Sequence, residues 1–127
     1  MTKTRKRTKP VNVSVKLVKT LLEIQHKVKI VHWATKSYNE HMATNTLYGA
    51  LQINIDAIVE KSNLTTKEML SLLSVDDISK SKLDKYLNDA ITKLEKIRIS
   101  RELDAIVDVI IGDIRQALYI MDMKYRQ

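Results

Sequence analysis

The feature that most constrains the fold is the spacing of apolar residues near the start of the chain. They recur at alternating steps of four and three residues, which places them on one face of an α-helix: Leu17, Leu21, Ile24, Val28 and Val31. Val18 and Leu22 widen this face, so the pattern predicts a helix packed against an interior rather than a narrow coiled-coil seam. The helix should begin near Asn12 or Val13, just after Pro10, and end near Lys36.

Three further long segments show helical periodicity. The second helix is expected from Tyr38 to Lys61, and its apolar residues cover most of the circumference, which predicts burial on most sides. The third and fourth helices each carry one apolar stripe, and Ser100 is the expected N-cap of the fourth. The stripes are Leu83, Leu87, Ala90, Ile91, Leu94 and Ile97 for the third, and Leu103, Val107, Ile110, Ile114, Leu118 and Met121 for the fourth.

The connection between the second and third helices, residues 62–80, is long enough to cross a bundle. Thr65 and Glu68 have the spacing of a capping box and predict a short helix there. Its apolar side would hold Met69, Leu70, Leu72 and Leu73, followed by a polar stretch over residues 76–81. The sequence therefore predicts an all-α fold, a ferritin-like four-helix bundle with a short helix in the crossover. A simple up-down-up-down bundle is the alternative.

Composition narrows the classes of protein. At 127 residues the chain forms one domain, and two glycines and one proline are few for a protein of many β-turns. The absence of cysteine excludes disulfides and thiolate metal sites. The polar N-terminus does not resemble a secretory signal, and no apolar run reaches the length of a membrane span. We expect an intracellular protein, in the cytoplasm or a DNA-containing compartment.

The positive charge is concentrated at the N-terminus. Of the formal net charge of +7, five charges lie in residues 1–10, which contain no acid: Lys3, Arg5, Lys6, Arg7 and Lys9. The remainder of the chain carries only +2. We expect residues 1–11 to be a disordered basic arm, and residues 12–127 to be the bundle domain. The arm could bind DNA phosphates, or it could be a solubilising terminus or a localisation signal.

A polar strip runs along the second helix. At about 100° per residue, five polar residues share one face: His41, Asn45, Gln52, Asp56 and Glu60. Asp56 and Glu60 are one turn apart, so their carboxylates could converge on one cation, and His32 lies near the core stripe of the first helix. Imidazole nitrogen with carboxylate oxygen suits iron, manganese or zinc. The alternative is a solvated face beside an interior histidine, and spacing alone leaves both open.

These residues also resemble a known ligand series. His32-Trp33, then His41, then Asp56-x-x-x-Glu60 are similar to the metal ligands of the Dps family, small ferritins named for DNA binding in starved cells. The stretch 33–41 looks closer still to short Dps-like proteins of large DNA viruses and phages. The resemblance implies iron as the metal, a homo-oligomer that is at least a dimer and takes the family's form of a dodecameric shell, and DNA as a partner. It also implies a site in which one subunit supplies the histidines and its two-fold neighbour the carboxylates.

Three positions depart from the family pattern. The interval from His32 to His41 is shorter than usual, Asn45 stands where many members have an Asp ligand, and Gly49 stands where the viral relatives often carry an acid. Three hypotheses follow: an iron-oxidising mini-ferritin, a DNA-binding shell without enzymatic activity, and a structural or DNA-packaging helical subunit, of a virus particle for example, with a degenerate metal site.

Overall fold

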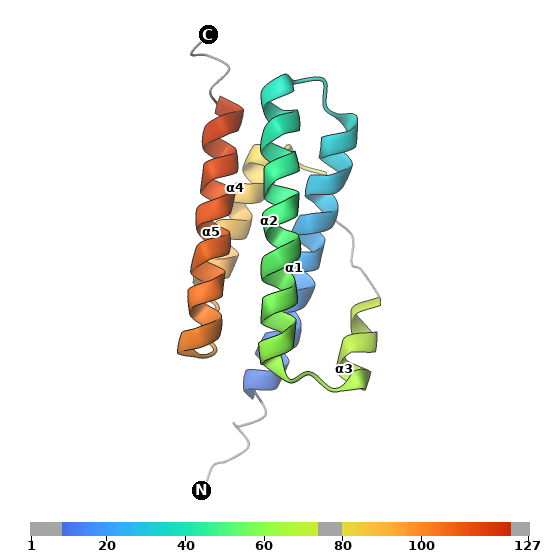
Figure 1. Ribbon diagram of the computed structural model, residues 1–127, viewed down its shortest axis with the longest axis vertical. Coiled ribbons are helices and arrows are strands. Elements are labelled where there is room, and N and C mark those ends of the chain that lie inside the picture. Colours follow the sequence, from blue (N-terminus) through green and yellow to red (C-terminus); the bar gives the residue numbers. More distant parts are fainter. Residues whose placement is uncertain (1–8, 74–79, 123–127) are drawn as a thin grey trace, which may run out of the picture.

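The computed structural model describes residues 9–73 and 80–122, and within these ranges the chain is helical, with no strand. This confirms the all-α prediction. The elements in chain order are α1 (Lys9–Ala34), α2 (Tyr38–Ser62), α3 (Thr66–Leu70), the 3-10 helix η2 (Ser71–Leu73), α4 (Leu83–Glu95) and α5 (Arg101–Asp122) (Figure 1).

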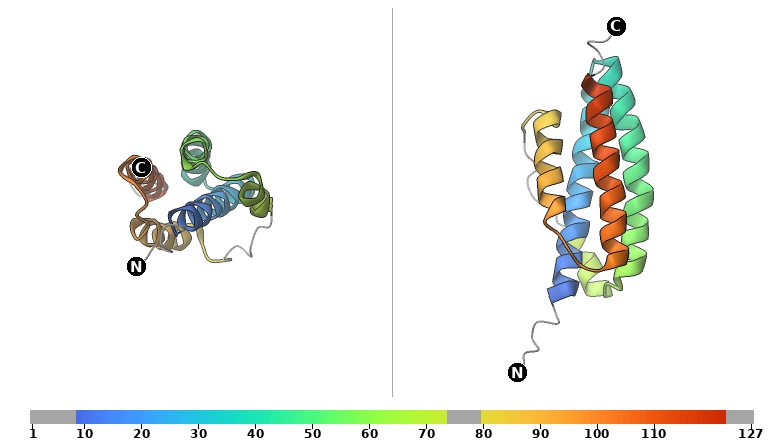
Figure 2. Two further views of the ribbon diagram at one scale, coloured as in Figure 1. Left: turned by 90° about the horizontal axis from the view of Figure 1, so that it is seen from below. Right: turned by 90° about the vertical axis from the view of Figure 1, so that its left-hand side faces the viewer.

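The four longer helices lie side by side around one core. In Figure 1, α1 and α5 run in one direction, and α2 and α4 run in the other. α2 lies between α1 and α5 and packs most extensively against both, whereas α4 makes smaller contacts with α1 and α5 on the opposite side (Figure 2). Because α2 and α4 run in the same direction, the end of α2 and the start of α4 lie toward opposite ends of the molecule (Figure 1).

The apolar stripes predicted from the sequence form the core. The fully buried side chains of largest volume come from all four longer helices: Leu17, Leu21, Ile24, Leu47, Leu51, Ile58, Leu87, Leu94, Ile110 and Ile114, with Val18 and Val28. Leu22 and Val31 pack against this core while partly exposed. Burial of this continuous apolar surface is the main favourable contribution to folding.

Local signals set most helix ends. The Ser37 hydroxyl accepts a hydrogen bond from the Glu40 amide at 3.2 Å, which caps α2 close to its predicted start. The end of α2 is fixed by Asn63, whose backbone is left-handed with φ 52° and ψ 43°. The helix α1 begins at Lys9, earlier than expected, because Pro10 sits in its first turn, where no backbone donor is needed.

The crossover has the predicted capping box. The Thr65 hydroxyl accepts from the Glu68 amide at 3.1 Å, and the Glu68 carboxylate accepts from the Thr65 amide at 2.8 Å. Of the apolar residues that follow, Leu72 packs against the core, whereas Met69, Leu70 and Leu73 are exposed. Most of the predicted polar stretch 76–81 lies outside the described residues.

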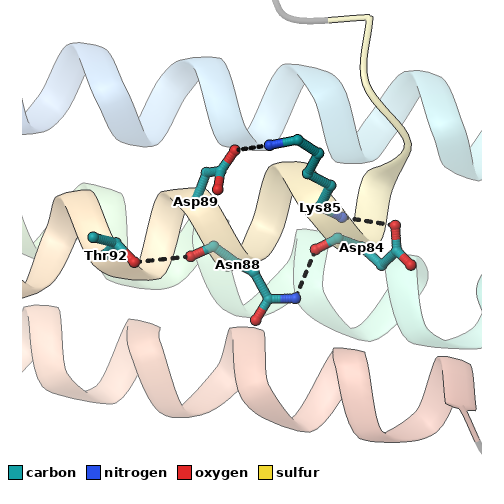
Figure 3. A network of polar contacts seen from close by, with 5 residues as sticks. All are labelled: Asp84, Lys85, Asn88, Asp89 and Thr92. Carbon is teal, nitrogen blue, oxygen red and sulfur yellow. Dashed lines mark hydrogen bonds and ion pairs between the residues drawn. The ribbon is translucent and has the colours of Figure 1, made fainter.

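α4 is the shortest of the four core helices. Its 13 residues extend about 20 Å, and it ends at Glu95, before Ile97 of the predicted stripe. The polar face of α4 is hydrogen-bonded within the helix itself (Figure 3). There the Lys85 ammonium pairs with Asp89 at 2.9 Å, and the Asn88 amide donates to the Asp84 carbonyl at 2.9 Å.

Candidate metal centre

The two candidate histidines meet at the junction of α1 and α2. His32 lies in the last turn of α1 and His41 in the first turn of α2, and residues 35–37 alone separate the helices. Because this connection is short, the antiparallel helices bring the two imidazoles together. Their rings stack with centroids 4.1 Å apart and planes inclined by 23°. Both residues were predicted from the sequence as candidate ligands, and the structure places them in direct contact.

The surroundings of His32 fix its tautomer. Its Nδ1 lies 3.1 Å from the His41 carbonyl oxygen and 3.0 Å from the Thr44 hydroxyl oxygen. A carbonyl oxygen can only accept, so Nδ1 is the donor, and in the neutral ring Nε2 then keeps a lone pair. Metal-binding histidines are commonly oriented in this way, with one ring nitrogen donating to a backbone oxygen. In that tautomer the Nε2 of His32 is available as a metal ligand.

Thr44 is a functional candidate that the sequence analysis missed. It is fully buried, and its hydroxyl donates to the Glu40 carbonyl at 2.7 Å, which leaves the oxygen able to accept from His32. The available signal was its position: Thr44 follows Ala43 on the inner face of α2, where a polar side chain needs a partner.

The candidate carboxylates lie on the outer face of α2. Asp56 and Glu60 are both exposed, and among the described residues neither carboxylate forms an ion pair or a side-chain hydrogen bond. They are one turn apart, so the two negative charges face each other without a counter-ion. This is a pair of acidic groups able to accept a cation.

The histidines and the carboxylates do not come together within one chain. Along α2, His41 and Asp56 are about 22 Å apart at a rise of about 1.5 Å per residue. In the described ranges, no three histidine or acidic side chains are close enough to hold a metal ion. A site that used all four residues would need ligands from a second chain.

The outer face of α2 also carries apolar side chains. Ile53 is 71% exposed and Tyr38 74% exposed, and Met42 lies on the same side. Between them is Gly49, where an added Cβ would meet nothing within 4 Å. The prediction that α2 is buried on most sides is therefore wrong for the isolated chain. Its inner face alone is buried, through Ala43, Thr44, Leu47, Leu51, Ile55 and Ile58.

The remaining polar residues of the predicted strip have different surroundings. Asn45 is exposed, and Gln52, also exposed, accepts a hydrogen bond from the Gln25 amide of α1 at 3.0 Å. Of the candidate DNA-binding residues, Lys9 is the first residue of α1, and the others lie outside the described part of the chain. Within that part, no helix has the combination of length and apolar character that a membrane crossing requires.

Comparison with known proteins gives one match. The model of a family described as a family of unknown function (DUF5856) matches residues 32–121, a range that begins at His32 and includes α2, α4 and nearly all of α5. No curated protein and no solved structure matches the chain. All four candidate metal ligands lie within the matched range.

Proposed function

We propose that this chain, which belongs to the family of unknown function DUF5856, is a Dps-like subunit with a ferritin-like four-helix arrangement. Two copies would pair through the outer faces of α2 and complete an iron site between them. Basic N-terminal arms would bind DNA. The observation that carries the proposal is the outer face of α2, which presents exposed apolar side chains beside two unpaired carboxylates.

The positions of the ligands favour an antiparallel pair. His41 and Asp56 are equidistant from the point between Tyr48 and Gly49, near the middle of α2. A two-fold axis at that point would place His41 of each subunit opposite Asp56 of the other, which gives two equivalent sites per dimer. Gly49 lies beside the axis, where a missing side chain lets helix backbones approach closely. Ile53 would be covered by the same contact.

Such a pair would have ligands suited to ferrous iron. The free Nε2 of His32 and the His41 imidazole would supply nitrogen, and Asp56 and Glu60 of the partner subunit would supply anionic oxygen. Iron would be bound here as a substrate, with dissolved dioxygen as the acceptor of the electron that each ferrous ion loses, and the anionic oxygens would favour the more highly charged ferric product. The bound cation would also remove the repulsion between the paired carboxylates.

DNA binding would come from the arms. Residues 1–8 carry Lys3, Arg5, Lys6 and Arg7 and no acid, and Lys9 continues the positive charge into α1. One short arm binds phosphates weakly, but several arms on one oligomer act together and multiply the affinity. A dodecameric shell is the assembly that the Dps resemblance implies.

The experiment is to measure native mass and ferrous oxidation on the same preparation of full-length protein. We expect sedimentation to give a dimer or a larger closed oligomer, and oxidation of added ferrous iron to be faster than in buffer. A monodisperse monomer at micromolar concentration would contradict the proposed pairing. Removing residues 1–8 should leave the number of subunits in the oligomer and α1 unchanged, while weakening DNA binding and reducing its dependence on salt.

The second candidate function is a structural or DNA-packaging subunit without iron chemistry. It is favoured by Asn45, whose neutral amide stands on the exposed side of α2 where an additional acidic ligand would strengthen the site. An oligomer that binds DNA but does not accelerate ferrous oxidation would select this alternative.

A further inference from the structure

In the folded chain, acidic and basic side chains gather on separate surfaces, although they are mixed along the sequence. A groove of about 1180 Å³ between α4 and α5 is lined by five acidic residues and two basic ones: Glu40, Asp84, Asp89, Glu95 and Asp122, with Lys82 and Arg115. At the C-terminal end of α4, three positive residues lie outside the lining of this groove. There Lys93 lies in the last turn, Lys96 is the C-cap, and Arg98 follows in the connection to α5.

Of these three residues, Lys93 faces the first half of α1. A pocket of about 410 Å³ lies between α1 and the end of α4, and its lining includes Lys16, Lys19 and Lys93 together with the Thr20 hydroxyl. Among the described lining residues, Glu23 is the single acid. We call the set Lys16, Lys19, Lys93, Lys96 and Arg98 the basic corner. Its charge comes from two helices far apart in sequence, so no local pattern reveals it.

Helix electrostatics accounts for part of this cluster. Lys93 and Lys96 lie at the C-terminal end of α4, where the helix dipole favours cations. Lys16 and Lys19 have no such reason, because they are neighbours at i and i+3, an arrangement of like charges that destabilises a helix. Glu95, which lies between Lys93 and Lys96 in the chain, pairs with Arg115 of α5 at 3.0 Å.

α1 as a whole is short of negative charge. Its sequence contains five lysines and one acid, Glu23, and its first turn contains no acid. A helix of this composition, packed beside a second cluster of cations, accumulates repulsion that an external polyanion would relieve. Lys16 also follows directly from the arm, because α1 begins at Lys9, about 10 Å earlier along the helix axis.

We infer that the basic corner binds phosphates of a nucleic acid backbone, as a second contact beside the arm. This inference rests on the proposed DNA-binding function and adds its site on the folded domain. The contact is independent of base sequence, because lysine ammonium groups at a shallow pocket reach phosphates and not base edges. It orients the subunit with the basic corner toward the nucleic acid and the acidic groove away from it.

The test compares two double variants with the same change of net charge. K16Q/K93Q neutralises the corner, and K36Q/K82Q neutralises two exposed lysines at the other end of the molecule. Each is made in the full-length chain and in a chain lacking residues 1–8. Binding to a duplex DNA oligonucleotide is measured over a salt series, with anionic lipid vesicles as a second probe and thermal unfolding as a check of the fold.

We expect K16Q/K93Q to weaken DNA binding by about 10- to 100-fold at moderate salt and to reduce the salt slope by about two, in both chains. K36Q/K82Q should change the slope far less. Equal losses in the two variants would overturn the inference, because net charge alone would then explain binding. A loss of binding to the lipid vesicles without a loss of binding to DNA would also overturn the inference. If K16Q/K93Q is silent while arm removal abolishes binding, the corner is excluded and the DNA-binding proposal stands. If the unaltered protein binds no DNA, the proposed DNA-binding function fails first.

Discussion

The two faces of α2 obey different constraints, although both look apolar in the sequence. On the inner face, Leu47, Leu51 and Ile58 are at most 1% exposed and belong to the core. On the outer face, Ile53 is 71% exposed, and it lies beside the unpaired carboxylates Asp56 and Glu60. The inner face is explained by folding of one chain. The outer face is not, and this difference is the main reason to infer a second chain.

The inner face should give the largest effect on stability. Leu51→Ala removes a fully buried side chain and should lower the free energy of unfolding by about 2–5 kcal/mol. Chemical denaturation of the variant and the unaltered protein measures this difference. If Leu51→Ala lowered the free energy of unfolding by less than about 1 kcal/mol, the inner face of α2 would contribute less to stability than its burial indicates.

The outer face should give a large effect on association and a small one on folding. Ile53→Asp places a charge in the proposed contact, so the oligomer should dissociate in sedimentation experiments. The stability of the separated chain should change by about 0.5 kcal/mol or less, as for other surface substitutions. Val109→Asp is the matched control, because Val109 is 54% exposed on α5, away from this face. Dissociation by both variants to the same extent would argue against a specific α2 contact.

The carboxylates of the outer face should matter for iron and not for folding. The double variant Asp56→Asn with Glu60→Gln should abolish ferrous oxidation. Its metal-free thermal stability should be unchanged or slightly raised, because it removes repulsion between like charges. Glu102→Gln with Asp108→Asn, also exposed acids, is the control for net charge. A fall in metal-free stability without any iron chemistry to lose would support a purely structural strip.

The smallest effect is expected at the border between α2 and α5. The Asn54 amide donates to the Asp113 carboxylate at 3.3 Å, and burial raises the pKa of Asp113 above its ordinary value of 3.8. A raised pKa means that the folded state binds the proton more tightly than the unfolded state. The stabilising contribution is therefore complete below the unfolded pKa and is lost as pH rises through the folded pKa.

Asp113→Asn should remove the loss of stability that accompanies ionisation of Asp113 as pH rises. Denaturation curves collected from acidic to neutral pH should show the variant gaining stability relative to the unaltered protein as pH rises. Asp108→Asn, which makes the same substitution at an exposed position on the same helix, is the control variant. A difference between Asp113→Asn and the unaltered protein that is constant with pH would mean that Asp113 does not titrate differently on folding.

The sequence predicted those features that depend on neighbouring residues. The apolar stripes, the Thr65–Glu68 capping box and the Ser100 cap were correct, and the Ser100 hydroxyl accepts from the Leu103 amide at 3.2 Å. These follow from helical geometry over a few residues. The features it did not predict depend on contacts between distant segments. The support of His32 by Thr44, the short α4 and the basic corner all require knowledge of how the helices pack.

The candidate site lies between these two cases. Its four residues were chosen by their spacing, and the structure brings His32 and His41 together but leaves Asp56 and Glu60 at the far end of α2. No periodic pattern in one chain distinguishes a solvated strip from half of a shared site. The iron and DNA functions are therefore still predictions, each with its own experiment.

The separation of about 22 Å between His41 and Asp56 has a consequence for how binding depends on concentration. If each half-site belongs to a different chain, the metal acts as a cross-link, and metal affinity and subunit affinity are thermodynamically linked. Dilution would then weaken metal binding, and excess metal would hold the subunits together at concentrations where the metal-free protein separates. A cell could therefore set the capacity of this protein for metal through the amount of chain it makes, without altering any ligand.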